Sequence, residues 1–271
     1  MQTTTKNDVI RKMKENHVDN DEAGYTHLLL TGGKYYIKNV DSVYTEMSKV
    51  LKHRDPVMPC VLEVHSIVFP LYFDLDLKVV ERVLPNDAIT SMVMTISKQV
   101  LRFYPMRMHG EIGDMIVLMR NGEPTVDDGM YKHGFHIHFP NLLLKNNQAM
   151  QIRASVVEGL QSLSWLVHFG SEPSWDTVVD SSVFGESRGK RTGETIIPYG
   201  SLRMVGAPKA KRCPNPKCPE WIKEKPKYHK KDCETCENEN NGHIIDKRVY
   251  EPYMAFHANG ESFIDELKRD P

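Results

Sequence analysis

The chain has 271 residues, of which 40% are hydrophobic and 26% charged, an ordinary globular composition with enough length to bury a sizeable core. No apolar run approaches the roughly 18 residues of a membrane span, and the polar N-terminus, MQTTTKNDVIRKMKENHVDN, excludes a secretory signal peptide. We therefore expect a cytoplasmic or nuclear protein.

The formal net charge of −1 conceals a strongly basic segment. Residues 188–231 contain thirteen Lys or Arg and three Glu, a net charge of +10, which leaves −11 for the rest of the chain. A segment this basic can bind a phosphate backbone by releasing counterions, although a solvated linker can have the same composition. The overall charge therefore does not exclude a nucleic-acid partner.

The first predicted elements are a hairpin, a helix and a strand-rich region. Residues 26–37, THLLLTGGKYYI, predict two short strands joined by a Gly-Gly turn. Asp41 is the expected N-cap of a helix over residues 42–53. Residues 60–77, CVLEVHSIVFPLYFDLDL, favour strands, and we expect Pro70 to mark a break before the two aspartates.

A longer helix is expected to begin at Asn86 or Asp87. Its apolar residues recur at helical spacing, which predicts a stripe buried in the core. The stripe consists of Ile89, Met92, Val93, Ile96, Val100 and Phe103.

The second half of the chain continues this alternation of strands and helices. Strands are expected at residues 114–119 and 135–139, another strand should end near Asp180, and residues 185–200 have the composition of a Gly-rich basic loop. Strands alternating with two helices predict an α/β sheet with helices packed on one face. The second helix is expected to bury Ile152, Val156, Leu160 and Leu163.

Two carboxylates stand in the apolar segment FPLYFDLDLK. Residues two apart on a strand share a face, so Asp74 and Asp76 should point to the same side, with Leu75 facing the other way. Like charges this close repel, and burying them unpaired is costly. A divalent cation such as Mg²⁺ or Mn²⁺ would remove that cost, whereas a solvated edge strand would avoid it.

Further candidate groups follow along the chain. His136 and His138 should share one strand face, and Gly134 should let a ligand approach the backbone closely. Three acids, a histidine and two or three cations are what a metal-bound triphosphate requires, because the acids bind the metals and the cations hold the phosphates. The remaining acid and cations are Asp180, Arg203 and Lys209.

Four of the five cysteines are crowded together in a C-x4-C-x14-C-x2-C pattern, while Cys60 stands apart and is expected in the core. Four thiolates suit one tetrahedral Zn²⁺, with His229 or His243 as substitutes for one cysteine. The polar segment between the pairs would need the metal to order it; reduced cysteines in an unstructured tail are the alternative. The four are Cys213, Cys218, Cys233 and Cys236.

In four segments the sequence resembles the motifs of archaeo-eukaryotic primases, most closely those of the PrimPol and large-DNA-virus branch with its poxvirus-type primase–helicases. The segments, in family order between residues 71 and 209, are LYFDLD, KHGFHIHF, VVDSSVF and LRMVGAPK. Lys132 and His136 fall on positions of the second motif, K-x-S-x-H. Two features depart from the pattern: Gly134 replaces the usual small hydroxyl residue, and the interval from Asp180 to Arg203 is longer.

The resemblance implies an α/β fold, a primase core with an RRM-like antiparallel sheet, an N-terminal subdomain and a small zinc-binding element. The implied boundaries are residues 1–60 for the N-terminal subdomain and 61–212 for the catalytic core. Residues 213–243 would form the zinc-binding insertion. Residues 244–271 would return to the core or lead into a further domain.

The resemblance also implies a template-dependent nucleotidyltransferase, a DNA primase or primase–polymerase that makes or extends primers on single-stranded DNA in viral or mobile-element replication. Two catalytic Mg²⁺ or Mn²⁺ ions would bind Asp74, Asp76 and Asp180, and one structural Zn²⁺ would bind the cysteines. Single-stranded DNA, nucleoside triphosphates and a helicase domain or subunit are the implied partners. The triphosphate would be neutralised by Lys132, His136, Arg203 and Lys209.

Two alternative functions are kept. HIHF is also the His-x-His signature of rolling-circle nucleases, whose nucleophilic tyrosine would be Tyr228 in YHKK. That hypothesis leaves the three acids, Arg203 and Lys209 unexplained. A catalytically inactive primase-like domain that only binds nucleic acid is the other alternative, and the intact acids argue against it.

Overall fold

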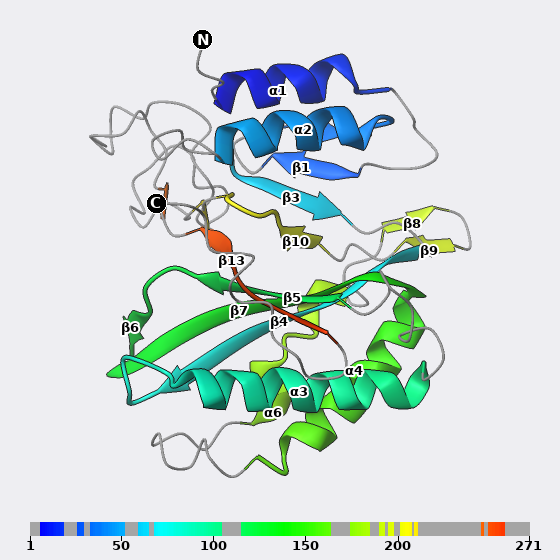
Figure 1. The fold of residues 1–271 in the computed structure, drawn as a ribbon. Helices are drawn as coiled ribbons and strands as arrows, with labels where there is room; N and C mark the ends of the chain where they lie inside the picture. The colour runs from blue at the N-terminus through cyan, green and yellow to red at the C-terminus, as the bar shows by residue number, and fades with distance from the viewer. Residues whose placement is uncertain are drawn as a thin grey trace, which may run out of the picture. The chain divides into compact units, whose positions relative to one another are not determined.

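The fold was derived from a computed structural model, and the chain divides into two compact units (Figure 1). The N-terminal unit comprises residues 1–64 and 201–249. The second unit comprises residues 65–200 and 250–271, and it is called the catalytic-motif unit because it contains the segments LYFDLD, KHGFHIHF and VVDSSVF. The structure describes residues 6–18, 26–29, 33–51, 59–64, 68–104, 115–163, 174–184, 190–192, 195–197, 201–207, 209–210, 245–246 and 249–257.

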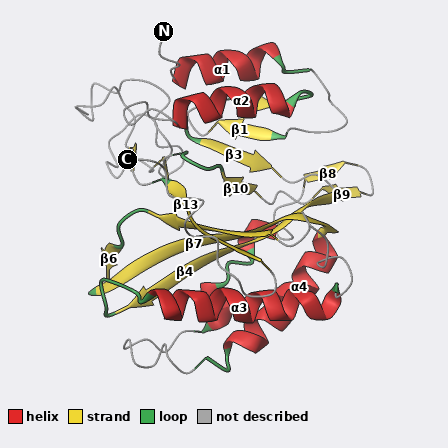
Figure 2. Cartoon of the chain, in the orientation of Figure 1, coloured by secondary structure: helices red, strands yellow, loops and turns green. Residues whose placement is uncertain are grey.

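The N-terminal unit contains an antiparallel sheet with two helices on one side (Figures 1 and 2). Apolar residues from both helices and the sheet form one core cluster that includes Val9, Met13, Val43 and Val61. The sheet order is β10 (Ser201–Arg203), β3 (Val61–Val64), β1 (His27–Leu29) and β2 (Lys34–Tyr35), and the helices are α1 (Lys6–Glu15) and α2 (Val40–Leu51).

The sequence predicted this unit in outline. The β1–β2 hairpin is confirmed, and Cys60 is buried. Asp41 does not cap α2, because the helix begins at Val40 and already contains Asp41. The side chain of Asn39, just before the helix, accepts the Ser42 N–H at 3.3 Å instead. Strands β3 and β10, which the expected boundaries assign to the catalytic core, pair with each other within this sheet.

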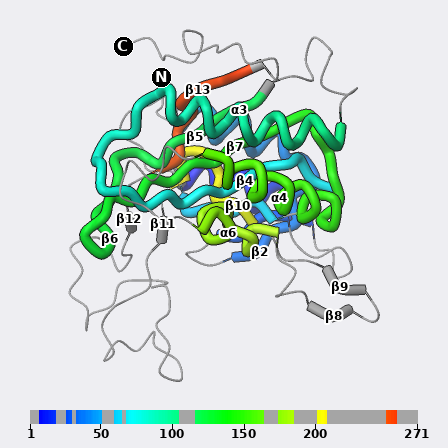
Figure 3. The backbone as a smooth tube through the Cα atoms, turned by 90° about the horizontal axis from the view of Figure 1, so that it is seen from below, coloured from blue at the N-terminus to red at the C-terminus, as the bar shows by residue number. Residues whose placement is uncertain are grey.

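The catalytic-motif unit is built on a five-stranded antiparallel sheet, which confirms an α/β fold with helices on one face. Helices α3 (Asn86–Phe103) and α4 (Asn146–Leu160) both cover the same side of the sheet (Figures 1 and 3). The sheet order is β13 (Tyr250–His257), β5 (Met115–Asn121), β7 (Met130–Lys145) and β4 (Val68–Val79), with β6 (Thr125–Asp127) paired to β7.

Burial along strand β4 alternates between its two faces, apart from Tyr72, which is also buried. Its odd-numbered residues from Phe69 to Val79 are buried on the helix-covered side, as is the α3 stripe from Ile89 to Val100. Phe103 is the exception to the predicted stripe, since it lies in the last turn of α3 and is 43% exposed. Pro70 does not end the strand; the register with β7 shifts between Pro70 and Leu71. The sheet order places β4 at its end, where a residue without an N–H is tolerated.

The segment before Asp180 is not the predicted strand. Residues Trp175–Val178 form the short helix α6, and only Val179 makes an isolated antiparallel bridge, to Leu75. A short 3₁₀ helix, η1, follows at Ser182–Phe184.

The basic loop predicted after η1 contains a small hairpin. Its strands are β8 (Lys190–Thr192) and β9 (Thr195–Ile197). A second two-stranded pairing joins β11 (Lys209–Ala210) to β12 (Ile245–Asp246). Among the helices described, none is long and apolar enough to cross a membrane.

His27 makes the stability of the N-terminal unit depend on pH. Its side chain is buried, with the residue only 1% exposed, and burial lowers the imidazole pKa from 6.5 to about 4 because the charged form loses its hydration. Nδ1 lies 2.9 Å from the Thr26 hydroxyl, and Nε2 lies 3.5 Å from the Tyr44 hydroxyl. The folded state therefore holds a neutral histidine that the unfolded state protonates below about pH 6.5.

We predict that the free energy of unfolding falls as the pH drops from 6.5 to 4, because only the unfolded chain takes up this proton. The difference between these two pKa values corresponds to a loss of roughly 3 kcal/mol in the free energy of unfolding once the pH is below about 4. His27→Gln should lose less stability over this range than the wild type, as measured by urea unfolding at several pH values. Equal losses in both proteins would contradict the assignment to His27.

Candidate active site

The face of the catalytic-motif sheet that points away from α3 and α4 carries Asp74, Asp76, Lys132 and His136. Antiparallel pairing sets Asp74 opposite His136 and Asp76 opposite Gly134. Because Phe73 and Leu75 are fully buried against the helices, the aspartates between and after them must point to the other face. The pairing of β4 with β7 thus brings the first two motifs together.

Each aspartate of this pair has a cationic or potentially cationic neighbour. The Lys132 ammonium lies 2.6 Å from Asp76 Oδ2, and His136 Nε2 lies 3.6 Å from Asp74 Oδ1. The Lys132 side chain is 31% exposed, whereas that of His136 is 2% exposed. The Lys132 ammonium therefore offsets part of the repulsion between the two carboxylates, and the two β7 neighbours differ in their access to solvent.

The backbone joins Asp180 directly to Asp74. The Asp180 N–H donates to the Asp74 carbonyl at 2.9 Å, next to the bridge between Val179 and Leu75. The Asp180 carboxylate accepts two hydrogen bonds from Ser182, one from its N–H and one from its hydroxyl, both at 2.8 Å. The third acid thus lies beside the first, in a turn fixed by its own side chain.

Arg153 of α4 holds the segment that leads to Asp180, a role that the sequence gave no sign of. The residue is only 7% exposed, and its guanidinium donates to the Val179 carbonyl from Nε at 2.9 Å and from Nη2 at 2.6 Å. It also donates to the Asp176 carbonyl at 2.5 Å and to the Asp176 carboxylate at 2.9 Å. These hydrogen bonds from the buried guanidinium of Arg153 fix the backbone from Asp176 to Val179 in place.

The donor set suits a hard divalent cation, although the ligands are not gathered around one point. Carboxylate oxygens are the ligands preferred by Mg²⁺ and Mn²⁺. In the described ranges, no three His, Cys, Asp or Glu side chains lie close enough together to hold an ion. The three acids share a neighbourhood, and each is turned toward its own partner: Asp74 to His136, Asp76 to Lys132 and Asp180 to Ser182.

His136 and His138, the two candidate histidines of β7, differ in environment. Burial lowers the pKa of His138 to about 4, so its imidazole is neutral near pH 7, and its ring is tilted against Tyr72 with centroids 5.9 Å apart. Its Nε2 is enclosed and has no hydrogen-bond partner within the described ranges. Tyr72 in turn donates to the Val183 carbonyl and stacks on Phe184. His138 therefore belongs to an aromatic cluster, and His136 contacts the acid.

The space above Gly134 is filled by a residue that sequence reasoning missed. The Tyr250 ring, from β13, stacks on His136 with centroids 3.4 Å apart, and an added Cβ on Gly134 would lie 2.8 Å from the Tyr250 hydroxyl. The expectation that Gly134 admits a ligand to the backbone is therefore corrected, since Tyr250 occupies that space. No local motif marks Tyr250, because its role depends on strand pairing far along the chain.

The remaining predicted residues belong to the N-terminal unit or lie outside the described ranges. Arg203 is on β10 and Lys209 on β11, both in the N-terminal unit, and of these the side chain of Arg203 alone is described. The predicted zinc ligands and the nuclease-type tyrosine lie outside the described residues: Cys213, Cys218, Tyr228, His229, Cys233, Cys236 and His243.

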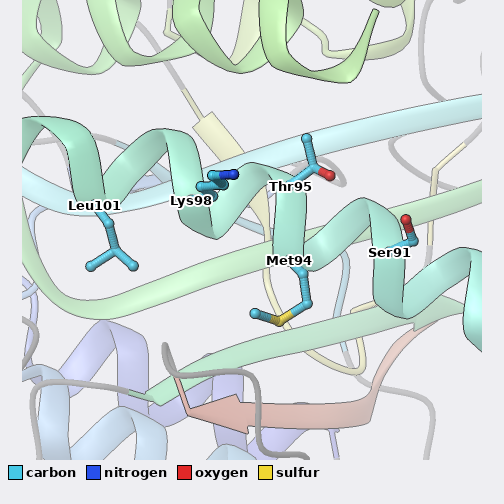
Figure 4. Close-up of a pocket in the computed structure, with 5 residues that line it drawn as sticks. All are labelled: Ser91, Met94, Thr95, Lys98 and Leu101. Atoms are coloured by element: carbon cyan, nitrogen blue, oxygen red, sulfur yellow. The ribbon is translucent and has the colours of Figure 1, made fainter. Parts of the chain in front are cut away.

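A depression of about 380 Å³ lies along α3 (Figure 4). Because α3 covers the other side of the sheet, this depression is separate from the face that carries Asp74 and Asp76. It is lined by Ser91, Met94, Thr95, Lys98 and Leu101.

An antiparallel sheet that gathers acid-x-acid, His and Lys groups on the face opposite its helices is consistent with a primase-type core. The family model for the C962R protein N-terminal AEP domain, where AEP denotes archaeo-eukaryotic primase, matches residues 26–188. The chain therefore belongs to the archaeo-eukaryotic primase superfamily, in the family of this domain of large-DNA-virus primase–helicases, which confirms the resemblance.

The matched range contains Asp74, Asp76, Lys132, His136 and Asp180, and it ends before Arg203, Lys209 and the cysteines. A comparison with curated proteins found no match. Members of the superfamily are generally nucleotidyltransferases that bind nucleic acid and nucleoside triphosphates.

Replacing Arg153 should loosen the Asp180 segment. Arg153→Met leaves the Val179 and Asp176 carbonyls without this donor, at an expected cost of about 1–3 kcal/mol in the free energy of unfolding. The Asp180 amide should then exchange its hydrogen faster, as measured by amide exchange. Arg102→Met serves as the control, because Arg102 is exposed and bonds only Gln99 among the described contacts. Unchanged exchange at Asp180 would show that Arg153 does not hold this segment.

Proposed function

We propose that this chain is a DNA primase or primase–polymerase, a template-dependent nucleotidyltransferase that makes or extends primers on single-stranded DNA. The observation that carries the proposal is the register of β4 and β7, which brings Asp74, Asp76, Lys132 and His136 to one face of the sheet, opposite the face covered by α3 and α4. Asp180 adjoins this group through its bond to the Asp74 backbone. Membership of the primase superfamily supports the same reading.

The three acids would hold the two catalytic ions, Mg²⁺ or Mn²⁺. When bound, such ions lower the pKa of the attacking 3′-hydroxyl and stabilise the departing pyrophosphate. The chain's own contribution is to fix three carboxylates on adjacent backbone segments, with Arg153 and Ser182 holding the Asp180 turn. This arrangement limits the side-chain motion needed to bring the acids onto a common centre.

The cations would bind the triphosphate. Lys132 is partly exposed and lies within an ion-pair distance of Asp76, so its ammonium can exchange a carboxylate oxygen for a phosphate oxygen. His136 is buried and held, which suits a group that orients one phosphate. Arg203 and Lys209 are proposed to contribute further positive charge on the strength of their motif alone.

The sheet of the catalytic-motif unit is proposed to be RRM-like. The support is its antiparallel order with α3 and α4 on one side and the candidate site on the other. The basic residues between 188 and 231 are proposed to contact single-stranded DNA, because their net charge suits a phosphate backbone. A helicase domain or subunit is the proposed partner in replication.

The acids are tested by Asp→Asn substitutions. Asp74→Asn, Asp76→Asn and Asp180→Asn should each reduce nucleotide addition at least about 100-fold, because each removes a charged metal ligand, while the fold is kept. The measurement is incubation with single-stranded DNA, labelled nucleotides and Mn²⁺, with and without an annealed primer. Asp128→Asn is the matched control: it removes a carboxylate from a turn with φ of 53°, a conformation that Asn also tolerates.

Three outcomes of that experiment would sink the proposal. Wild-type rates in any of the three acid variants would rule out the three-acid site. Cleavage of single-stranded DNA with covalent attachment through Tyr228 would identify the rolling-circle nuclease instead. Binding of DNA without any nucleotide addition by the wild type would identify an inactive binding domain.

We further propose that Cys213, Cys218, Cys233 and Cys236 bind one structural Zn²⁺, as their spacing suggests. Metal analysis of purified protein should find about one zinc per chain, lost in Cys233→Ser/Cys236→Ser. That variant should still extend an annealed primer at nearly the wild-type rate but fail to start primers de novo, because the cysteines follow the active-site motifs in the chain. Parallel loss of both activities would mean that the zinc supports the whole fold, and protein without zinc would remove the proposal.

A further inference from the structure

The ring of Tyr250 packs directly on the imidazole of His136. The two ring centroids are 3.4 Å apart with 25° between the planes, and Tyr250 is only 3% exposed. Tyr250 is the first residue of β13 and pairs with Asn121 of β5, so backbone hydrogen bonding in the sheet fixes its position. On the acid side of the same imidazole, Nε2 lies 3.6 Å from Asp74 Oδ1.

Gly134 makes room for this tyrosine. A Cβ at residue 134 would lie 2.8 Å from the Tyr250 hydroxyl and 3.2 Å from the Asn121 Cβ, and the first distance is too short for a real contact. The backbone itself does not demand glycine, because Gly134 is not among the described residues with positive φ. Any side chain here would have to displace the Tyr250 ring or move the strand.

We propose that Tyr250 is a positioning residue for His136 and that Gly134 is required to admit it. The ring holds the imidazole against Asp74 and prevents it from turning into the space above Gly134. The inference rests on the proposed function in one respect, namely that His136 binds the nucleotide triphosphate. Held in this way, His136 meets the phosphate in one orientation, so less conformational freedom is lost on binding.

A purely structural role for Tyr250 makes different predictions. If the ring only fills space, a large apolar residue should replace it, and nucleotide affinity should follow stability alone. If it positions His136, then removing the aromatic ring should weaken nucleotide binding in protein that remains folded. Phenylalanine should preserve function, because it keeps the ring and loses only the hydroxyl.

The first measurement is direct nucleotide binding by the chain of residues 1–271, using calorimetry with a deoxynucleoside triphosphate and Mn²⁺. Tyr250→Phe should bind within about twofold of the wild type, and Tyr250→Leu should bind about five- to tenfold more weakly, the size expected from a lost aromatic pair. Gly134→Ser should resemble Tyr250→Leu, because the new side chain displaces the ring. Tyr253→Leu is the matched control, since Tyr253 lies on the same strand and bonds Asn86 rather than His136.

A double substitution tests the pairing of Gly134 with Tyr250. In Gly134→Ser/Tyr250→Leu the serine no longer meets the phenol, so the double variant should bind nucleotide no more weakly than Tyr250→Leu alone. Additive losses would show that the glycine serves some other purpose and would overturn the pairing. Non-additivity of this kind is expected only for residues that share one contact.

The second measurement needs neither nucleotide nor activity. Stacking on Tyr250 should shift the His136 ring protons upfield in NMR spectra of the wild type and of Tyr250→Phe. That shift should be lost in Tyr250→Leu and in Gly134→Ser. If Tyr250→Leu does not fold, Gly134→Ala provides the same comparison with a single added methyl group.

The outcomes separate this inference from the proposed function. Unchanged His136 shifts in folded Tyr250→Leu, or unchanged nucleotide affinity, would overturn the positioning role. A wild-type chain that shows the stacked His136 signal but binds no nucleotide would sink the proposed function and would still support Tyr250 as the residue that holds His136.

Discussion

The antiparallel pairing of β4 with β7 is the constraint on which the rest of the catalytic-motif unit depends. Side chains alternate between faces along both strands, so one register puts Phe73 and Leu75 under the helices and Asp74 and Asp76 on the opposite face. A slip of one residue would bury both carboxylates and expose the aromatic core. The energy of burying that core therefore also fixes the arrangement of the charged groups.

This constraint also explains how acids are tolerated in so apolar a strand. Neither aspartate lies on the face covered by α3 and α4, and each has a neighbour on β7: the Lys132 ammonium offsets the charge of Asp76, and the His136 imidazole lies 3.6 Å from Asp74 Oδ1. The pairing of β4 with β7 thus places the positive charge of Lys132 beside Asp76, as a bound metal ion is proposed to place positive charge beside the acids. The Lys132 side chain is partly exposed, so it can reach a ligand from solvent, whereas the His136 side chain is buried and held in place.

Local pattern was enough to predict most of this unit. The period of two in FDLD predicted which face of the strand each residue takes, and the helical spacing from Ile89 to Val100 predicted the buried side of α3; both were confirmed. The strand expected before Asp180 was wrong, because α6 owes its position to a buried arginine on α4 rather than to its own sequence. Tyr250 could not be predicted, since its contact with His136 depends on the pairing of β13 with β5, which no nearby residue signals.

Strand β13 enters the sheet last, and this order matters while the chain is being made. Until residues 250–257 emerge and pair, the backbone of β5 from Met115 to Asn121 is the open edge of the sheet. An open edge with an apolar sequence such as MIVLM is a template for pairing with another chain. Nascent or prematurely terminated chains that lack β13 would therefore tend to associate through β5. The strand that carries Tyr250 thereby also protects newly made protein from aggregation.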